Sequence, residues 1–170
     1  GYLPFIDNFF RRILKKNREY FFNYFEASID INKEHSVLDV GTTDIVNDSE
    51  NIFIQMYPYR KNITCLSNQK LESLKQKYPE LNVKIGDARS MTFNDKSFDL
   101  VHSNATIEHV GNYQNQIKFI KECFRVSNKL IFIQTPNKYF PIDFHTKIPI
   151  IHFLPGKIHR FILKLFGLKF

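Results

Sequence analysis

The sequence has 170 residues, enough for one domain with one core, and it carries a net charge of +7 with 18 Phe and 8 Tyr residues. No apolar stretch is long enough for a membrane-spanning helix, which needs about 18 residues or more, and the N-terminus lacks the apolar block of a secretory signal. Cys65 and Cys123 stand alone in apolar contexts, so we expect two buried thiols in a reduced, cytoplasmic protein.

The positive charge is concentrated near the C-terminal end of the sequence. Residues 138–170 hold six Lys and Arg residues against a single acid, Asp143, whereas residues 37–137 hold 12 basic and 11 acidic residues. A nearly neutral central region argues against a nucleic-acid-binding groove across it. The distribution instead predicts a basic surface in the C-terminal segment.

Residues 4–29 have the spacing of an amphipathic helix. Apolar side chains recur every three or four residues, and basic residues occupy the turns between them. The apolar set is Phe5, Phe9, Ile13, Leu14, Phe21, Phe22, Phe25 and Ile29. The spacing predicts an N-terminal helical cap over residues 1–35, made of one helix or a pair. Two roles are open for it, which are packing on the core and forming a lid over a pocket.

From residue 36 onwards the pattern alternates between strands and helices. We expect strands at 36–41, 61–66, 82–86, 97–103 and 129–135, and helices at 45–57, 68–78 and 114–126. Alternating strand–helix units predict an α/β fold with a mostly parallel sheet and helices on both faces. Near-continuous apolar runs in the first, fourth and fifth strands are typical of central, buried positions in such a sheet.

After Thr135 this alternation ends. Prolines at positions 136, 141, 149 and 155 exclude a long helix over 136–156, and helical spacing returns only at 157–166. We expect a single domain over 1–170, consisting of the cap, a cofactor-binding core at 36–137 and a basic segment at 138–170. Three histidines, His145, His152 and His159, recur every seven residues, but the prolines break the helix that would stack them, so no metal site is expected.

The most informative stretch is Val-Leu-Asp-Val-Gly-Thr-Thr-Asp at 37–44, which reads as a buried strand followed by a tight polar loop. In a βαβ unit such a loop binds a cofactor, because main-chain N–H groups converge there. The loop has neither the Lys-Ser/Thr pair of a triphosphate-binding loop nor the spaced glycines of a dinucleotide site. These absences exclude both of those cofactor classes.

A second motif identifies a family. Gly-Asp-Ala at 86–88 is followed by Phe-Asn-Asp-Lys-Ser-Phe-Asp-Leu-Val at 93–101 and by Ile-Glu-His-Val at 107–110. This series resembles the class I S-adenosylmethionine-dependent methyltransferases. The Asp-Val-Gly-Thr-Thr-Asp loop, the Tyr-Pro-Tyr block at 57–59 and the Thr-Pro-Asn motif at 135–137, with its Phe-Pro-Ile, His-Thr and Leu-Pro continuation, resemble one branch of that superfamily.

The resemblance implies a Rossmann-like sheet of order 3-2-1-4-5, a C-terminal hairpin for which this chain has little room, and S-adenosylmethionine as the cofactor. It implies roles for particular residues along the cofactor. Gly41, Thr42 and Asp44 would meet the methionine end; Ser67 or Asn68 the ribose; Asp87 with Ala88 the adenine; and Asn104 and His109 would face the acceptor. Asp39 and Asn104 would also belong to the cofactor-binding residues. The second strand ends without the carboxylate that usually binds the ribose in this superfamily.

The function implied is methyl transfer from S-adenosylmethionine to a small molecule or to a lipid- or sugar-linked acceptor. His109 would be the catalytic base for a hydroxyl acceptor, since histidine exchanges protons near neutral pH; the alternative is a structural histidine. A non-catalytic binding or membrane-associated module of the same fold is the competing function. Nucleic acid is not expected as a partner. The basic, apolar segment 157–170 predicts either peripheral contact with an anionic membrane or a helix packed on the sheet.

Overall fold

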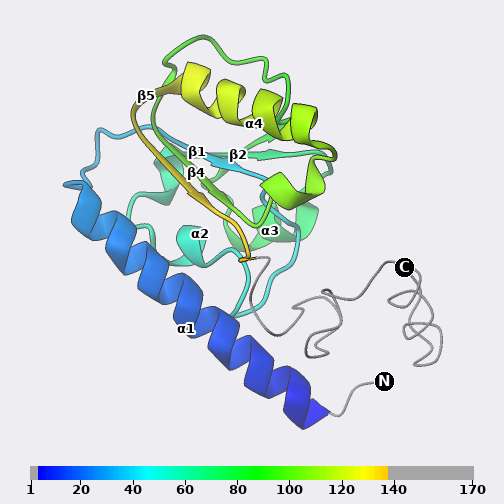
Figure 1. Cartoon of the computed structure of the whole chain (residues 1–170). Helices are drawn as coiled ribbons and strands as arrows, with labels where there is room; N and C mark the ends of the chain where they lie inside the picture. Colours follow the sequence, from blue (N-terminus) through cyan, green and yellow to red (C-terminus); the bar gives the residue numbers. More distant parts are fainter. Residues whose placement is uncertain (1–3, 138–170) are drawn as a thin grey trace. The chain divides into compact units, whose positions relative to one another are not determined.

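The computed structural model describes residues 4–137, and its centre is a parallel β-sheet (Figure 1). The strands are β1 (Val37–Val40), β2 (Ile63–Ser67), β3 (Asn82–Ile85), β4 (Phe98–Asn104) and β5 (Ser127–Gln134). Their order within the described residues is β3-β2-β1-β4-β5, and each neighbouring pair is parallel. The predicted α/β fold and strand order are therefore confirmed.

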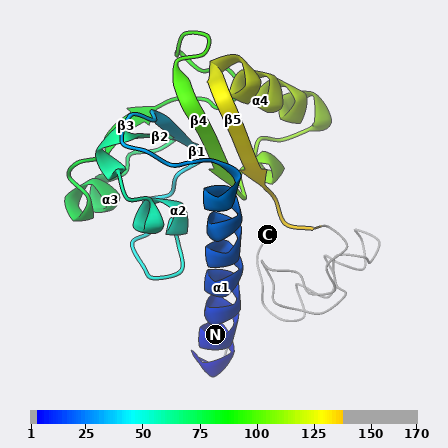
Figure 2. The ribbon, with the colours of Figure 1, turned by 90° about the vertical axis from the view of Figure 1, so that its left-hand side faces the viewer.

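Helices cover both faces of this sheet. They are α1 (Pro4–Ser28), α2 (Ile52–Met56), α3 (Glu72–Lys77) and α4 (Tyr113–Val126), with short 3-10 turns η1 (Arg60–Asn62) and η2 (Ile107–His109). The views in Figures 1 and 2 place α1, α2 and α3 on one face and α4 on the other. The described residues up to Thr135 belong to one compact unit. Within residues 4–137, no helix combines the length and the apolar character needed to cross a membrane.

The sheet separates two apolar cores. The first joins α1, α2 and α3 to the sheet, and its buried members include Phe22, Phe25, Phe53, Ile54 and Leu74. The second lies under α4 and includes Leu38, Val101, Phe119, Cys123 and Val126. Every residue of β1 is buried, as expected for a central strand covered on both faces. Burying each large side chain contributes about 1.5–3 kcal/mol, so both faces of the sheet stabilise the fold.

The N-terminal cap is one continuous helix, α1, which resolves the choice between a helix and a pair. Its C-terminal half packs on the core through aromatic contacts. The ring of Phe53 in α2 lies 5.7 Å from the ring of Phe22 and 5.2 Å from the ring of Phe25. The core-packing role predicted for this segment is therefore present in the second half of α1.

The helix predicted over 45–57 is wrong in its first half, because α2 begins only at Ile52. The Asn47 side-chain oxygen accepts hydrogen bonds from the main-chain N–H groups of Ser49, at 2.9 Å, and Glu50, at 2.8 Å. Such local bonds compete with helical ones. Asn51 then adopts a left-handed conformation, with φ of 49°. Residues 41–51 therefore form a loop and not the start of a helix.

The other predicted helices and strands are present with shifted ends. Helix α3 begins at Glu72 and not at residue 68, and α4 begins one residue before its predicted start. Both cysteines are buried and free, as expected. Burial raises the pKa of Cys65 and raises the pKa of Cys123 to about 12, so neither thiol is ionised near neutral pH. The segment predicted as a helix at 157–166 lies outside the described residues.

The connection order creates a switch point in the middle of the sheet. The chain builds β1, β2 and β3 outwards in one direction, and then returns to place β4 on the other side of β1. Open α/β sheets bind ligands at the carboxyl ends of the two strands where this reversal happens. In this chain those ends are followed by the loop 41–51 and by residues 105–109.

Candidate functional site

Gly41 and Thr106 join the two loops at the switch point. Gly41 has a φ of +86°, and a Cβ atom at this position would lie 2.0 Å from the Oγ1 atom of Thr106. The Thr106 hydroxyl donates to the carbonyl oxygen of Val40 at 3.2 Å. Only glycine satisfies both the left-handed conformation and the close approach. Gly41 is therefore required by the conformation of the loop.

Asp39 of β1 and Thr42 of the loop are both buried. The Asp39 Oδ1 atom is 2.6 Å from Nδ1 of His102, and its Oδ2 atom accepts a hydrogen bond from the Thr42 hydroxyl at 2.6 Å. Asp39, Thr42 and His102 are all buried. Both carboxylate oxygens of Asp39 therefore bond to side chains of the protein, one to His102 and one to Thr42. The bond to Thr42 holds the start of the loop against β1.

The His102 ring is held by aromatic neighbours. The ring of Phe53 stacks on it at 3.9 Å with an interplanar angle of 11°, and the ring of Phe132 lies 6.4 Å away at 13°. His102 is thus buried in the core of the fold. The sequence carried no signal for its pairing with Asp39.

Asp44 caps a helix. Its carboxylate accepts hydrogen bonds from the main-chain N–H groups of Leu74, at 2.8 Å, and Ser73, at 3.2 Å, in the first turn of α3. These bonds, with that of Leu74 the strongest, lower the pKa of Asp44. The structure thus directs Asp44, which we expected at the methionine end of the cofactor, towards α3.

Thr43 and Gln134 were not identified from the sequence. Among the described residues, the Thr43 hydroxyl and the Gln134 side-chain nitrogen are buried polar atoms without a hydrogen-bond partner. Gln134 is paired with Asn104 in the register of β4 and β5, so it also lies at the carboxyl end of the sheet. Buried polar groups are nearly always bonded, so such atoms are candidates for ligand contacts.

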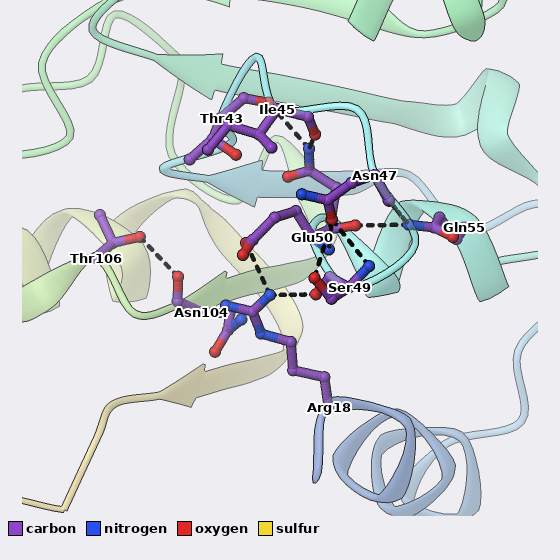
Figure 3. A network of polar contacts seen from close by, with 10 residues as sticks. Arg18, Thr43, Ile45, Asn47, Ser49, Glu50, Gln55, Asn104 and Thr106 are labelled. Atoms are coloured by element: carbon purple, nitrogen blue, oxygen red, sulfur yellow. Dashed lines mark hydrogen bonds and ion pairs between the residues drawn. The ribbon is translucent and has the colours of Figure 1, made fainter. Parts of the chain in front are cut away.

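The loop 41–51 is held by amide side chains (Figure 3). Asn51 donates to the carbonyl oxygens of Thr43 and Ile45, and Gln55 donates to those of Asn47 and Glu50. Arg18 of α1 reaches the same loop and contacts Glu50 and the carbonyl of Ser49. The network replaces the regular helix that was expected here, and it ties α1 to the site.

At the ends of β2 and β3, Asp87 is the exposed acceptor. Ser67 is buried, whereas the side chain of Asn68 is exposed, and Ala88 is half-buried. The Arg89 guanidinium binds both oxygens of Asp87, with Nη2 at 2.6 Å from Oδ2 and Nε at 2.9 Å from Oδ1. Hydrogen bonds from Arg89 lower the pKa of Asp87 to about 2. Asp87 is therefore ionised at neutral pH, and Arg89 is a second group at this end that the sequence reading did not single out.

At the ends of β4 and β5, Asn104 is half-buried, and Ala105 adopts a left-handed conformation with φ of 52°. His109 is exposed on the turn η2, and its main-chain N–H donates to the carbonyl of Thr106 at 2.9 Å. Glu108, on the same turn, accepts a hydrogen bond from the Thr135 hydroxyl at 3.2 Å. The structure therefore carries Asn104 and His109 on the same carboxyl side of the sheet as Gly41.

One family model matches the central part of the chain. Residues 49–130 match the family model described as a methyltransferase domain. This region, just under half of the chain, contains Asp87, Asn104 and His109 but neither Gly41 nor α1. A search of curated proteins finds no match.

Solved structures share the fold at low identity. The YcgJ protein of Bacillus subtilis is 20% identical with a TM-score of 0.50, over 65% of this chain and 47% of that one. The PH0226 protein of Pyrococcus horikoshii OT3 is 18% identical with a TM-score of 0.54, over 66% and 52%. A Methanococcus maripaludis protein, provisionally described as an S-adenosyl-L-methionine-dependent methyltransferase, is 15% identical with a TM-score of 0.53, over 78% and 64%.

This chain spans about half the length of the first two structures. Identities this low establish the fold alone. The family match adds that residues 49–130 resemble a methyltransferase domain.

Proposed function

We propose that this chain binds S-adenosylmethionine and transfers its methyl group to a small molecule or to a lipid- or sugar-linked acceptor. Two observations carry the proposal: Gly41 packs against Thr106 at the switch point, and Asp87 is ionised after β3, at the same carboxyl edge of the sheet. The family match over residues 49–130 supports the same function.

The residues present fit the cofactor. Asp87 offers an exposed, ionised acceptor for an adenine amine, and Ser67 and Asn68 offer neutral groups for a ribose. A neutral acceptor contributes about 0.5–1.5 kcal/mol where a charged one contributes about 1.5–3, so we expect a modest affinity. The hydroxyl of Thr43, which has no hydrogen-bond partner among the described residues, offers a further contact within the loop.

When bound, S-adenosylmethionine supplies an already electrophilic methyl group. The chain's task is to align the acceptor with that group and to exclude water. Asn104 would hold the acceptor side, and an imidazole nitrogen of His109 would take the proton from an acceptor hydroxyl. His109→Ala should lower turnover while leaving cofactor affinity near that of the parent; equal turnover would make His109 a structural residue.

Calorimetric titration with S-adenosylmethionine and its demethylated product tests the proposal. We expect dissociation constants from micromolar to sub-millimolar. The absence of both heat and a thermal shift at millimolar ligand would contradict it. The second candidate, a non-catalytic module of the same fold, is favoured by the internal engagement of Asp39, Thr42 and Asp44, which leaves those side chains bonded to the protein.

The cytoplasmic location and the membrane contact remain proposals. The segment 157–170 lies outside the described residues. Its apolar and basic composition favours binding to anionic vesicles, where each basic residue near the surface adds roughly 1 kcal/mol. Sedimentation with anionic liposomes that is lost at high salt or on deletion of 157–170 would support contact. Equal sedimentation with neutral and anionic vesicles would favour the packed helix.

A further inference from the structure

Arg18 and Glu50 form a sheltered ion pair between α1 and the loop 41–51 (Figure 3). Nη1 of Arg18 lies 2.7 Å from Oε2 of Glu50 and also donates to the carbonyl oxygen of Ser49. The two side chains are 18% and 27% exposed. Lys15 and Asp48 pair one turn away between the same two segments, but at 3.5 Å and with side chains 38% and 76% exposed. The Arg18–Glu50 pair is thus the better enclosed of the two.

Glu50 is held in place by its main chain. Its N–H group donates to the Asn47 side chain at 2.8 Å, and its carbonyl oxygen accepts from Gln55 Nε2 at 2.6 Å. The neighbouring Ser49 is buried and is bonded to the same Asn47 oxygen. A charge whose backbone is fixed in this way is preorganised, so it binds a ligand with little ordering cost.

The pair retains unused bonding capacity. Within the described residues both contacts of the guanidinium use Nη1, so Nε and Nη2 of Arg18 and Oε1 of Glu50 make no further hydrogen bond. The loop 41–51, which carries Glu50, follows β1 at the switch point, and Figure 3 shows Arg18 reaching this loop from α1. The pair therefore stands beside the switch point with a donor fork and a carboxylate oxygen still available.

We infer that Arg18 and Glu50 recognise an α-amino-acid group, with the Arg18 guanidinium on the carboxylate and the Glu50 carboxylate on the ammonium. Opposite charges fixed side by side complement a zwitterion, and a guanidinium binds a carboxylate with paired, charge-assisted bonds. The group has two sources, which are the methionyl end of the cofactor and an amino-acid acceptor. The first source rests on the proposed function. Arg18 lies on α1, outside the region matched by the family model, whereas Glu50 lies inside it.

Two nucleosides test the inference on the full chain. S-adenosylhomocysteine carries the α-amino-acid group, and 5′-methylthioadenosine lacks it. We expect the parent to bind S-adenosylhomocysteine at least about tenfold more tightly, and Arg18→Met to remove this preference while leaving the affinity for 5′-methylthioadenosine unchanged. Glu50→Gln should reduce the preference less, and Arg18→Lys should restore part of it. Lys15→Met is the matched control and should bind both ligands as the parent does.

Each other outcome has a defined reading. Arg18→Met could weaken the binding of both nucleosides equally, or of neither. If free methionine and glycine then also show no Arg18-dependent binding, the ion pair only holds α1 in place and the inference is overturned. If neither nucleoside binds to the parent but free amino acids bind in an Arg18-dependent way, the inference stands with an amino-acid ligand while the proposed cofactor is contradicted. Thermal unfolding of each variant identifies any loss that comes from misfolding.

Discussion

Asp39 and His102 face each other on neighbouring strands β1 and β4, with Oδ1 and Nδ1 2.6 Å apart in the core of the sheet. The same carboxylate accepts a hydrogen bond from the hydroxyl of Thr42, which lies at the start of the loop at the candidate site. The stacked ring of Phe53 excludes water from one side of the imidazole. This pair therefore links the core of the fold to the position of the cofactor loop.

Breaking the Asp39–His102 pair should destabilise the protein more than removing both partners. Removal of one member of a buried hydrogen-bonded pair leaves the polar group of the other unsatisfied, at about 1–3 kcal/mol. We expect losses of this order for His102→Leu and for Asp39→Leu, and a loss in the double variant that is well below their sum. Urea unfolding of the four proteins measures this coupling. Additive losses, within about 0.5 kcal/mol, would contradict it.

Gly41→Ala should disrupt the site through conformation and collision together. A non-glycine residue in the left-handed region costs about 1–3 kcal/mol, and the new Cβ would strike the Thr106 side chain. Gly86→Ala is the matched control, because its Cβ would lie 3.2 Å from a Leu66 methyl group without a positive φ. Urea unfolding should show a clearly larger loss for Gly41→Ala, and similar losses in the two variants would refute the argument.

Asp44→Ala should lower the melting temperature without weakening cofactor binding. The carboxylate caps α3 through the Leu74 and Ser73 amides, and its pKa is lowered by those bonds. A lowered folded-state pKa means that the contribution of Asp44 to stability is present at neutral pH and is lost as the pH falls through that value. Thermal scans and S-adenosylhomocysteine titration separate the two roles. Weaker nucleoside binding with an unchanged melting temperature would show instead that Asp44 contacts the cofactor.

Asp87→Ala should weaken the binding of S-adenosylhomocysteine by about 1–3 kcal/mol, the range for losing a hydrogen bond to a charged group. The fold should be little affected, because the Asp87 side chain is 48% exposed and its ion partner Arg89 lies two residues away on the same turn. Calorimetry on the variant measures the affinity, and the unfolding curve checks the fold. An unchanged affinity would show that the adenine is bound elsewhere.

Asp99 should make stability fall in acid. Its carboxylate accepts the main-chain N–H and the hydroxyl of Ser36, each at 3.0 Å, and lies 3.1 Å from Lys129 Nζ. Burial acts to raise the pKa of Asp99, but these contacts prevail and lower it from 3.8 to about 2. Because the folded-state value is the lower one, the stabilisation is complete above about pH 4 and disappears as the pH falls towards 2.

Asp99→Asn should therefore lower the free energy of unfolding by about 1–3 kcal/mol at neutral pH and flatten its dependence between pH 4 and pH 2. Asp48→Asn, at a side chain 76% exposed, is the control and should leave that slope unchanged. Urea unfolding at several pH values gives both quantities. A slope in Asp99→Asn equal to that of the parent would contradict the assignment.

The sequence by itself determined the architecture and the edge of the sheet at which to look. Strands such as Val37–Val40 are apolar because both of their faces are covered, and the alternation of strands with helices is a local property that periodicity reports. Gly41 and Asp87 were found in the same way, since a residue directly after a parallel strand always lies at the carboxyl edge.

Only the tertiary structure decided what the side chains at that edge contact. Asp39 meets His102 and Asp44 meets Leu74 across separations of 63 and 30 residues, and no periodic pattern encodes such pairs. The same holds for Arg18 and Glu50, which are brought together by the packing of α1. The helix predicted over 45–57 failed for a different reason, because Asn47 bonds its own neighbours in place of continuing a helix. The spacing of apolar residues in the sequence indicates which face of a helix or strand is buried. The partners of polar side chains depend on which segments come into contact when those faces pack together.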